Sequence, residues 1–271
     1  MIKRLFFRGG LGNQMFQYAL YKELKERGVN VLIDTSLYKS TSMHNGFEID
    51  RVFNLSGRVY ETHSKFYNLL IRFLERFHFD CFYYHDNNIL GYNPEVFTTK
   101  KKILTGYYCA EKYFEDIKDF IRAEFTFRSI DEKNKEIATE MSQCNSVSVH
   151  IRRGDFVEWG MHLTGIDYYK KAINHILHNV ECPVFYVFSD NLESASEFMK
   201  DLNVPFKTVE INRGGDSYKD MYLMSQCKHN ITINSTFSWW AAWLNSNKDK
   251  IVIALRNTPD WCCDGWIVMD E

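Results

Sequence analysis

The sequence has no Cys-x-x-Cys pair, although seven cysteines are scattered along its 271 residues. An odd number of cysteines, two of them adjacent, fits reduced thiols better than a disulfide framework. Cysteines without metal-ligand spacing also argue against a zinc site. The fold is therefore not expected to depend on disulfides or on a structural metal.

Long apolar runs are absent too. No window reaches the roughly 20 apolar residues that a membrane-spanning helix needs. The start, residues 1–7, runs into a glycine pair without the features of a signal peptide. These absences predict a cytoplasmic protein without a transmembrane segment. Residues 66–79 are predicted to form a basic helix. Its basic face is interpreted as solvated, and peripheral contact with the inner face of the cytoplasmic membrane is the alternative.

A large excess of charge is also missing, because the formal net charge at pH 7 is −2. This argues against a surface for nucleic acid, so any phosphate site is expected to be local and to take a small ligand. A hydrophobic share of 45% and a charged share of 25% are typical of a soluble globular protein. The aromatic share of 16% is high; aromatic rings line sugar and base sites, but most must belong to the core.

The hydrophobic pattern opens with strand, glycine turn, helix and strand, and a second alternation of strands and helices starts near residue 140. We predict an α/β protein with mainly parallel sheets in two domains, residues 1–140 and 141–271. The expected strands are 2–7, 29–33, 147–152, 184–188, 230–233 and, as the last one, 251–255. The expected helices are 14–27, 66–79, 111–120, 130–144, 167–178, 192–202, 216–226 and one that ends at 244.

The stretch H-I-R-R-G-D-F-V-E-W follows an apolar strand pattern. Alternation places His150 and Arg152 on one face of that strand. Two arginines at the carboxyl end of a strand do not suit a core, but a guanidinium fork can hold a phosphate bidentately. The alternative is that Arg152 and Arg153 form surface ion pairs with Asp155 or Glu158.

Two further strands end in polar residues, S-D-N at 189–191 and N-S-T at 234–236. Ligands of open α/β sheets bind beyond the carboxyl ends of the strands. Together with the arginine pair, these ends predict a nucleotide-diphosphate site. Ser235 or Thr236 is expected to cap the next helix, whose first amides would then meet a phosphate oxygen.

The turn G-G-L-G-N-Q at 9–14 joins the first strand to the first helix. Such a turn offers backbone N–H groups to an anion and lets a ligand approach closely, for instance at Gly10. Its spacing matches neither the dinucleotide fingerprint nor a P-loop, so a tight turn without a ligand is the favoured interpretation from these residues alone. The amides of Asn13 and Gln14 suit sugar hydroxyls.

Asp220 and the tryptophans each have two interpretations. An exposed acid in the first turn of its helix is favoured for Asp220, and a carboxylate that accepts guanine N1–H and N2–H is the alternative. The tryptophans of the W-W-A-A-W run at 239–243 have helical spacing and predict core. Trp159, Trp261 and Trp266 lie in loop-like segments and are better suited to stacking on a sugar.

Four segments resemble the bacterial α-1,2-fucosyltransferases of glycosyltransferase family 11, in the family's order and spacing. They are F-F-R-G-G-L-G-N-Q-M-F-Q-Y-A at 6–19, V-S-V-H-I-R-R-G-D-F at 147–156, F-S-D-N at 188–191 and N-S-T-F-S-W-W-A-A-W-L at 234–244. The H-x-R-R-G-D segment is also similar to the α-1,6- and protein O-fucosyltransferases. The resemblance implies a GT-B fold, two Rossmann-like domains facing across a cleft, with the acceptor mainly on the first and GDP-fucose mainly on the second.

The resemblance also implies roles for single residues. Arg152 would hold the donor's diphosphate, supported by Arg153, while His150 and Asp220 would contact the guanosine. Asn13 would lie near the reacting sugars. Further donor-site residues would be Gly10, Asp190, Ser235, Thr236 and Phe237. Related fucosyltransferases need no metal, so we expect no metal and no cofactor, with GDP-fucose as co-substrate.

The implied reaction is an inverting transfer of L-fucose from GDP-β-L-fucose to the 2-hydroxyl of a terminal β-galactoside, in O-antigen or capsule synthesis. The acceptor would be a galactoside-terminated oligosaccharide or a lipid-linked glycan. Arg152 would stabilise the leaving diphosphate, and Asp155 ranks before Glu158 as the general base. The alternatives are a fucosyltransferase of another linkage, a transferase of another GDP-sugar, and a non-catalytic nucleotide-sugar or carbohydrate binding module.

Overall fold

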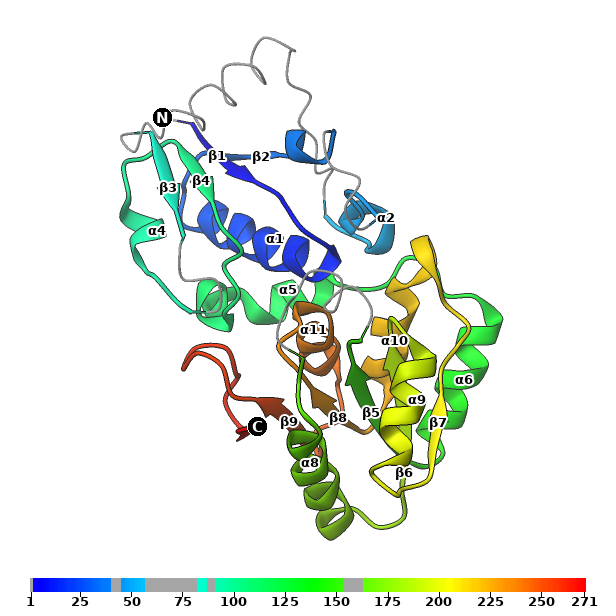
Figure 1. Cartoon of the computed structure of the whole chain (residues 1–271). Coiled ribbons are helices and arrows are strands. Elements are labelled where there is room, and N and C mark those ends of the chain that lie inside the picture. Colours follow the sequence, from blue (N-terminus) through cyan, green and yellow to red (C-terminus); the bar gives the residue numbers. More distant parts are fainter. Residues whose placement is uncertain (1, 40–44, 57–81, 87–90, 154–162) are drawn as a thin grey trace. The chain divides into compact units, whose positions relative to one another are not determined.

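The computed structural model of the chain describes residues 2–39, 45–56, 82–86, 91–153 and 163–271 (Figure 1). The chain divides into two compact units, each with its own parallel sheet. The first unit comprises residues 1–128 and 258–261, and the second comprises 129–257 and 262–271. The expected boundary between residues 140 and 141 falls within helix α6 (Glu132–Ser142), which belongs to the second unit. The predicted helix over 66–79 lies outside the described residues.

The first unit is built on a four-stranded parallel sheet with the strand order β2-β1-β4-β3. Its strands are β1 (Lys3–Phe6), β2 (Val31–Asp34), β3 (Tyr83–His85) and β4 (Ile103–Thr105). The predicted opening is confirmed, with α1 (Leu11–Glu26) between β1 and β2. Gly28 follows the helix with a positive φ of 75°, as a C-cap glycine does. β3 and β4 have three residues each, too few for alternation to show in the sequence.

The other helical segments described in the first unit are short. They are η1 (Ser36–Lys39), α2 (Ile49–Val52), α4 (Glu95–Thr98), η2 (Glu111–Tyr113), η3 (Glu115–Ile117) and α5 (Lys118–Glu124). The prediction of one helix over 111–120 is wrong. The backbone leaves the helical region at Phe114, with φ −144° and ψ 21°, and Tyr113 and Phe114 are both fully buried.

The second unit is built on a six-stranded parallel sheet with the order β10-β9-β8-β5-β6-β7. Its strands are β5 (Asn145–Ile151), β6 (Pro183–Ser189), β7 (Phe206–Thr208), β8 (His229–Thr232), β9 (Val252–Leu255) and β10 (Ile267–Met269). The four strands predicted here are confirmed, but β9 is not the last. The two missed strands, β7 and β10, are three-residue edge strands. Chain order reverses beside β5, which is where ligands bind in sheets of this kind.

Helices cover both faces of the second sheet (Figure 1). They are α6, α8 (Ile166–Asn179), α9 (Leu192–Lys200), α10 (Tyr218–Gln226) and α11 (Thr236–Leu244), with the turn η4 (Gly214–Asp216) before α10. α8 and α9 pack on the face that carries Val147, Val149 and Ile151 of β5. α6, α10 and α11 pack together on the other face, toward which His150 points.

The tryptophans of the W-W-A-A-W run are buried, which confirms that they belong to the core. The ring of Trp266 lies 5.5 Å from that of Trp239, centroid to centroid. Trp261 is only 1% exposed, so its assignment to a sugar-stacking loop is wrong. Trp159 lies outside the described residues. In the described part of the chain, no helix combines the length and the apolar character needed to span a bilayer.

Candidate functional site

The carboxyl ends of β5 and β6 carry one linked group of polar residues. Arg152 directly follows β5, and its Nε lies 3.5 Å from Oδ2 of Asp190, which follows β6. The backbone N–H of Arg153 donates to Oδ1 of the same carboxylate at 2.9 Å. Asp190 therefore joins the two strand ends. Asp155 and Glu158, the partners expected as the alternative, lie outside the described residues.

The two arginines point in different directions. The Arg152 side chain is 19% exposed and lies near His150, on the face of α11. The Arg153 guanidinium instead lies 4.3 Å above the ring of Phe198 in α9, and its Nη2 donates to the Thr164 carbonyl. Arg153 is thus fixed against the opposite face of the sheet. Only Arg152 combines partial exposure with a position beside the other predicted residues.

His150 is buried between β5 and the start of α11. It is 7% exposed, and its ring centroid lies 6.1 Å from that of Phe237. Burial, helped by the Arg152 charge, lowers the pKa of His150 to about 3. The ring is therefore neutral at physiological pH, with one nitrogen that donates and one that accepts.

Three buried polar atoms at the ends of β5 and β8 have no hydrogen-bond partner among the described residues. They are Nδ1 of His150, Oδ1 of Asn234 and Oγ of Ser235. Ser235 occupies the N-cap position of α11, but its hydroxyl makes no capping bond. An unsatisfied buried polar group costs about 1–3 kcal/mol. The three residues end or follow two adjacent strands, so this edge is a candidate ligand site.

The first turn of α11 favours an anion at this edge. A helix leaves its first N–H groups without intrahelical partners and carries a positive dipole end there. The first turn of α11 contains no acidic residue. Arg152 adds a positive charge that Asp190 partly balances, and neutral His150 adds a ring nitrogen.

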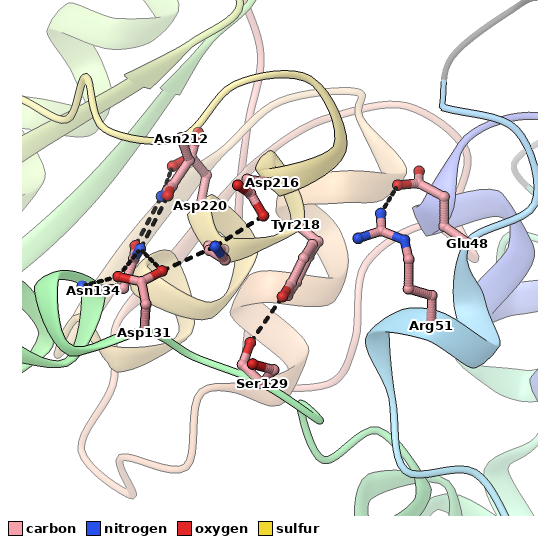
Figure 2. Close-up of polar contacts among 10 residues, drawn as sticks. Glu48, Arg51, Ser129, Asp131, Asn134, Asn212, Asp216, Tyr218 and Asp220 are labelled. Carbon is pink, nitrogen blue, oxygen red and sulfur yellow. Dashed lines mark hydrogen bonds and ion pairs between the residues drawn. The ribbon is translucent and has the colours of Figure 1, made fainter.

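Asp220 lies in the first turn of α10, which starts at the same edge because it follows parallel strand β7. Its Oδ1 accepts a hydrogen bond of 2.8 Å from Nδ2 of Asn212 (Figure 2). Burial raises the pKa of Asp220 to about 7. The favoured interpretation as an exposed acid is therefore wrong, because the carboxyl group is largely buried. Asn212 was missed, since a single asparagine in an irregular loop gives no periodic signal.

In the first unit, the glycine-rich turn is shaped by its own side chains. Gly9 has a φ of +80°, and a Cβ there would lie 2.4 Å from Nδ2 of Asn13. Gln14 is fully buried; its amide donates to the carbonyls of Gly9 and Gly46 and accepts from the N–H groups of Glu48 and Ile49. Gln14 therefore holds loops together and is not available to a sugar.

The side-chain amide of Asn13, in contrast, is partly exposed. Gly10 occupies the N-cap position of α1 in an extended conformation. Gln17, one turn further, is also fully buried. Its amide binds the backbone of Arg8 and the carbonyl of Gly106, which ties the ends of β1 and β4 together. Sequence reasoning missed this clamp, because a buried glutamine looks like any polar residue of a helix.

The sequence profile of glycosyl transferase family 11 matches residues 4–262. An α-1,2-colitosyltransferase of Escherichia coli is 31% identical over 97% of this chain and 97% of that protein. The O-antigen biosynthesis glycosyltransferase WbnK of E. coli is 32% identical over 96% of this chain and 97% of its own length. Human galactoside α-(1,2)-fucosyltransferase 1 is 28% identical, over 58% of this chain and 46% of its own length.

Two solved fucosyltransferase structures have a similar backbone. NodZ α-1,6-fucosyltransferase soaked with GDP-fucose has a TM-score of 0.52 at 18% identity, covering 90% of this chain and 93% of that one. Arabidopsis thaliana FUT1 in complex with GDP has a TM-score of 0.55 at 14% identity, covering 96% of this chain and 71% of that one. At such identities the likeness concerns the fold alone. The predicted fold, of GT-B type with two parallel-sheet units, is confirmed.

The contact between Gly9 and Asn13 predicts a stability difference between two glycine substitutions. Gly9→Ala and Gly28→Ala both place alanine at a positive φ, which costs about 1 kcal/mol. Only Gly9→Ala also displaces the Asn13 amide, because no atom lies within 4 Å of a Cβ at Gly28. We expect a lower melting temperature for Gly9→Ala than for Gly28→Ala. Equal losses would show that the Asn13 contact is without cost.

The raised pKa of Asp220 predicts a pH-dependent stability difference. The folded protein keeps this proton up to about pH 7, whereas the unfolded chain loses it near the ordinary value of 3.8. The free energy of unfolding therefore falls as the pH rises between these values. We expect Asp220→Asn to be more stable than wild type at pH 8, with an advantage that disappears by pH 4. Urea titrations would measure it, and a difference independent of pH would refute the burial argument.

Proposed function

The chain belongs to glycosyl transferase family 11, and we propose that it moves L-fucose from GDP-β-L-fucose to the 2-hydroxyl of a terminal β-galactoside with inversion. The E. coli colitosyltransferase and the human fucosyltransferase both carry α-1,2 in their names, which supports this linkage. A transferase of colitose is the second candidate, because the colitosyltransferase matches nearly the whole chain. Colitose is fucose without its 3-hydroxyl, so both sugars suit one pocket shape.

The observation that carries the proposal is the edge around Arg152. A diphosphate there would bind the Arg152 guanidinium and the first amides of α11, while Ser235 and Thr236 offer hydroxyls to its oxygens. The ligand would also give partners to the buried polar atoms of His150, Asn234 and Ser235. In this arrangement Asp190 holds Arg152 in place before the ligand arrives.

The proposed reaction is a single displacement. The bond between the anomeric carbon of fucose and the diphosphate oxygen breaks, and the acceptor oxygen bonds to that carbon from the opposite side. The bonding electrons leave with GDP, whose growing negative charge is stabilised by Arg152 and the α11 amides. The proton of the acceptor hydroxyl passes to a general base, for which Asp155 ranks before Glu158.

The guanine base and the sugars would be recognised by a second set of residues. Ionised Asp220 would accept hydrogen bonds from guanine N1–H and the 2-amino group. His150 and Phe237 would also contact the donor nucleotide. Gly10 would let the donor approach the first turn closely, and Asn13 would hydrogen-bond the reacting sugars. We also propose that no metal is required, because the protein's own cation and helix amides face the diphosphate.

The setting we propose is O-antigen or capsule synthesis, because one relative is an O-antigen biosynthesis glycosyltransferase. The acceptor would then be a galactoside-terminated oligosaccharide or a lipid-linked glycan. The enzyme would work in the cytoplasm, at the inner face of the membrane where such a glycan is presented.

Removing the Arg152 side chain should suppress turnover. We expect Arg152→Ala to lower kcat by about 10²- to 10³-fold, the typical effect of losing one preorganised electrostatic contact. Arg152→Lys should recover only part of this loss, because an ammonium does not bind a phosphate bidentately. Arg256→Ala is the matched control, since Arg256 follows β9, two strands away from β5 in the same sheet, and pairs with exposed Asp270. Near-normal turnover of Arg152→Ala would refute the proposed diphosphate site.

Donor and linkage are tested by direct incubation. We expect the protein to release GDP from GDP-fucose in the presence of lactose, equally with and without EDTA, and to form an α-1,2-linked product. A higher kcat/KM with GDP-colitose would select the second candidate instead. Loss of turnover in EDTA would contradict metal independence, and binding of GDP-fucose without turnover would indicate a binding module.

A further inference from the structure

Two asparagines of the second unit form a hydrogen-bonded pair between α6 and the loop before α10 (Figure 2). Nδ2 of Asn134 donates to Oδ1 of Asn212 at 3.0 Å, and Nδ2 of Asn212 donates to Oδ1 of Asn134 at 2.9 Å. Asn134 is 2% exposed. Each end of the pair meets a carboxylate: Asn134 donates to Asp131 at 2.9 Å, and Asn212 donates to Asp220 at 2.8 Å.

These bonds fix the orientation of both amides. Each amide nitrogen has two hydrogens, one used within the pair and one given to a carboxylate. Turning over either amide would place a carbonyl oxygen against a carboxylate and lose its donated bonds. Asp131 and Asp220 therefore set the direction of the hydrogen bonds in the whole Asn134–Asn212 relay, the row Asp131, Asn134, Asn212 and Asp220. Because Oδ1 of Asp220 accepts one hydrogen bond from Asn212, its second lone pair and both lone pairs of Oδ2 are left for a ligand.

The nearest lysine in the sequence does not neutralise Asp220. Nζ of Lys219 lies 2.9 Å from Oδ2 of Asp131 and 2.8 Å from Oδ1 of Asp216. Among the described residues, Asn212 is the hydrogen-bond partner of the Asp220 carboxylate. One neutral amide only partly offsets the cost of burying this carboxylate. A ligand that brings further N–H donors would therefore stabilise its charge.

The relay lies at the same edge of the sheet as the proposed diphosphate site. α10 and α11 follow β7 and β8 and so begin at the carboxyl edge of the parallel sheet. α6 also begins there, because it ends where β5 starts. α10 packs against α6 on one side and against α11 on the other. Asp220 in the first turn of α10 therefore lies at the same edge of the sheet as the α11 start, where the diphosphate would bind.

We propose that Asn212, held in place by Asn134, is a positioning residue that orients the Asp220 carboxylate for recognition of the guanine base. The inference rests on the proposed function, because it assumes a GDP-linked donor. Guanine offers N1–H and a 2-amino group side by side, which matches the two oxygens of one oriented carboxylate. Hypoxanthine lacks the 2-amino group, and adenine presents an acceptor at N1. Asn212 thereby determines base specificity without touching the base.

Calorimetric titration of the full-length protein with GDP and with inosine diphosphate tests this role. Wild type should prefer GDP by about tenfold, the value of one hydrogen bond to a charged group. Asn212→Ala should weaken GDP binding about tenfold, weaken inosine diphosphate less, and bring the two affinities together. Asn212→Asp, which keeps the shape but not the donor, should act in the same direction. Asn134→Ala should show a smaller shift.

Asn145→Ala is the matched control. Asn145 belongs to the same unit and hydrogen-bonds Glu181 and Lys228, but it begins β5 and so lies at the amino edge of the sheet. Its substitution should leave the preference for GDP unchanged. A double mutant adds a second readout: once Asp220 is changed to Asn, Asn212→Ala should cost less than about twofold more, because its effect passes through Asp220.

The outcomes separate the inference from the proposed function. If Asn212→Ala and Asn212→Asp weaken both nucleotides by the same factor, or neither, the positioning role is refuted although GDP still binds. The same holds if the effects of Asn212→Ala and Asp220→Asn simply add. If wild type binds GDP no better than ADP or UDP, the proposed donor itself is wrong.

Discussion

The parallel register of the second sheet is the constraint on which the rest of the site depends. It brings the carboxyl ends of β5, β6 and β8 to one edge, and it makes the covering helices α6, α10 and α11 begin at that edge. Residues far apart in the sequence, such as Arg152, Asp220 and Ser235, are thereby gathered without any local signal that links them. The positive helix ends and the arginine give that edge its preference for an anion.

The polar groups at this edge are costly for the fold alone. Three buried atoms at the ends of β5 and β8 make no bond to a described residue, and Asp220 keeps its proton to about pH 7 because burial disfavours its charge. In the first unit, by contrast, Gln14 and Gln17 are buried but fully bonded to loop backbone. These two glutamines hold loops of the fold, a role that the hydroxyl of Ser235 and Nδ1 of His150 do not have.

The sequence predicts the elements whose pattern is long and local. The opening βαβ unit, β5, β6, β8, the helices around them and the buried tryptophan run follow from periodicity. β3, β4, β7 and β10 were missed because three residues show no alternation. Asp190 as the partner of Arg152, and the Asn134–Asn212 relay behind Asp220, depend on tertiary contacts between distant segments. Trp261 was misassigned because its burial comes from packing that a loop-like sequence does not reveal.

The central claim is that the second unit binds the donor's diphosphate between Arg152 and the start of α11. The most direct test is a crystal structure of the full chain with intact GDP-fucose. The account predicts diphosphate oxygens in hydrogen-bond contact with the Arg152 guanidinium and the first α11 amides. It also predicts the guanine edge against Asp220. A diphosphate bound instead at the glycine-rich turn before α1, with Arg152 still facing Asp190, would contradict it.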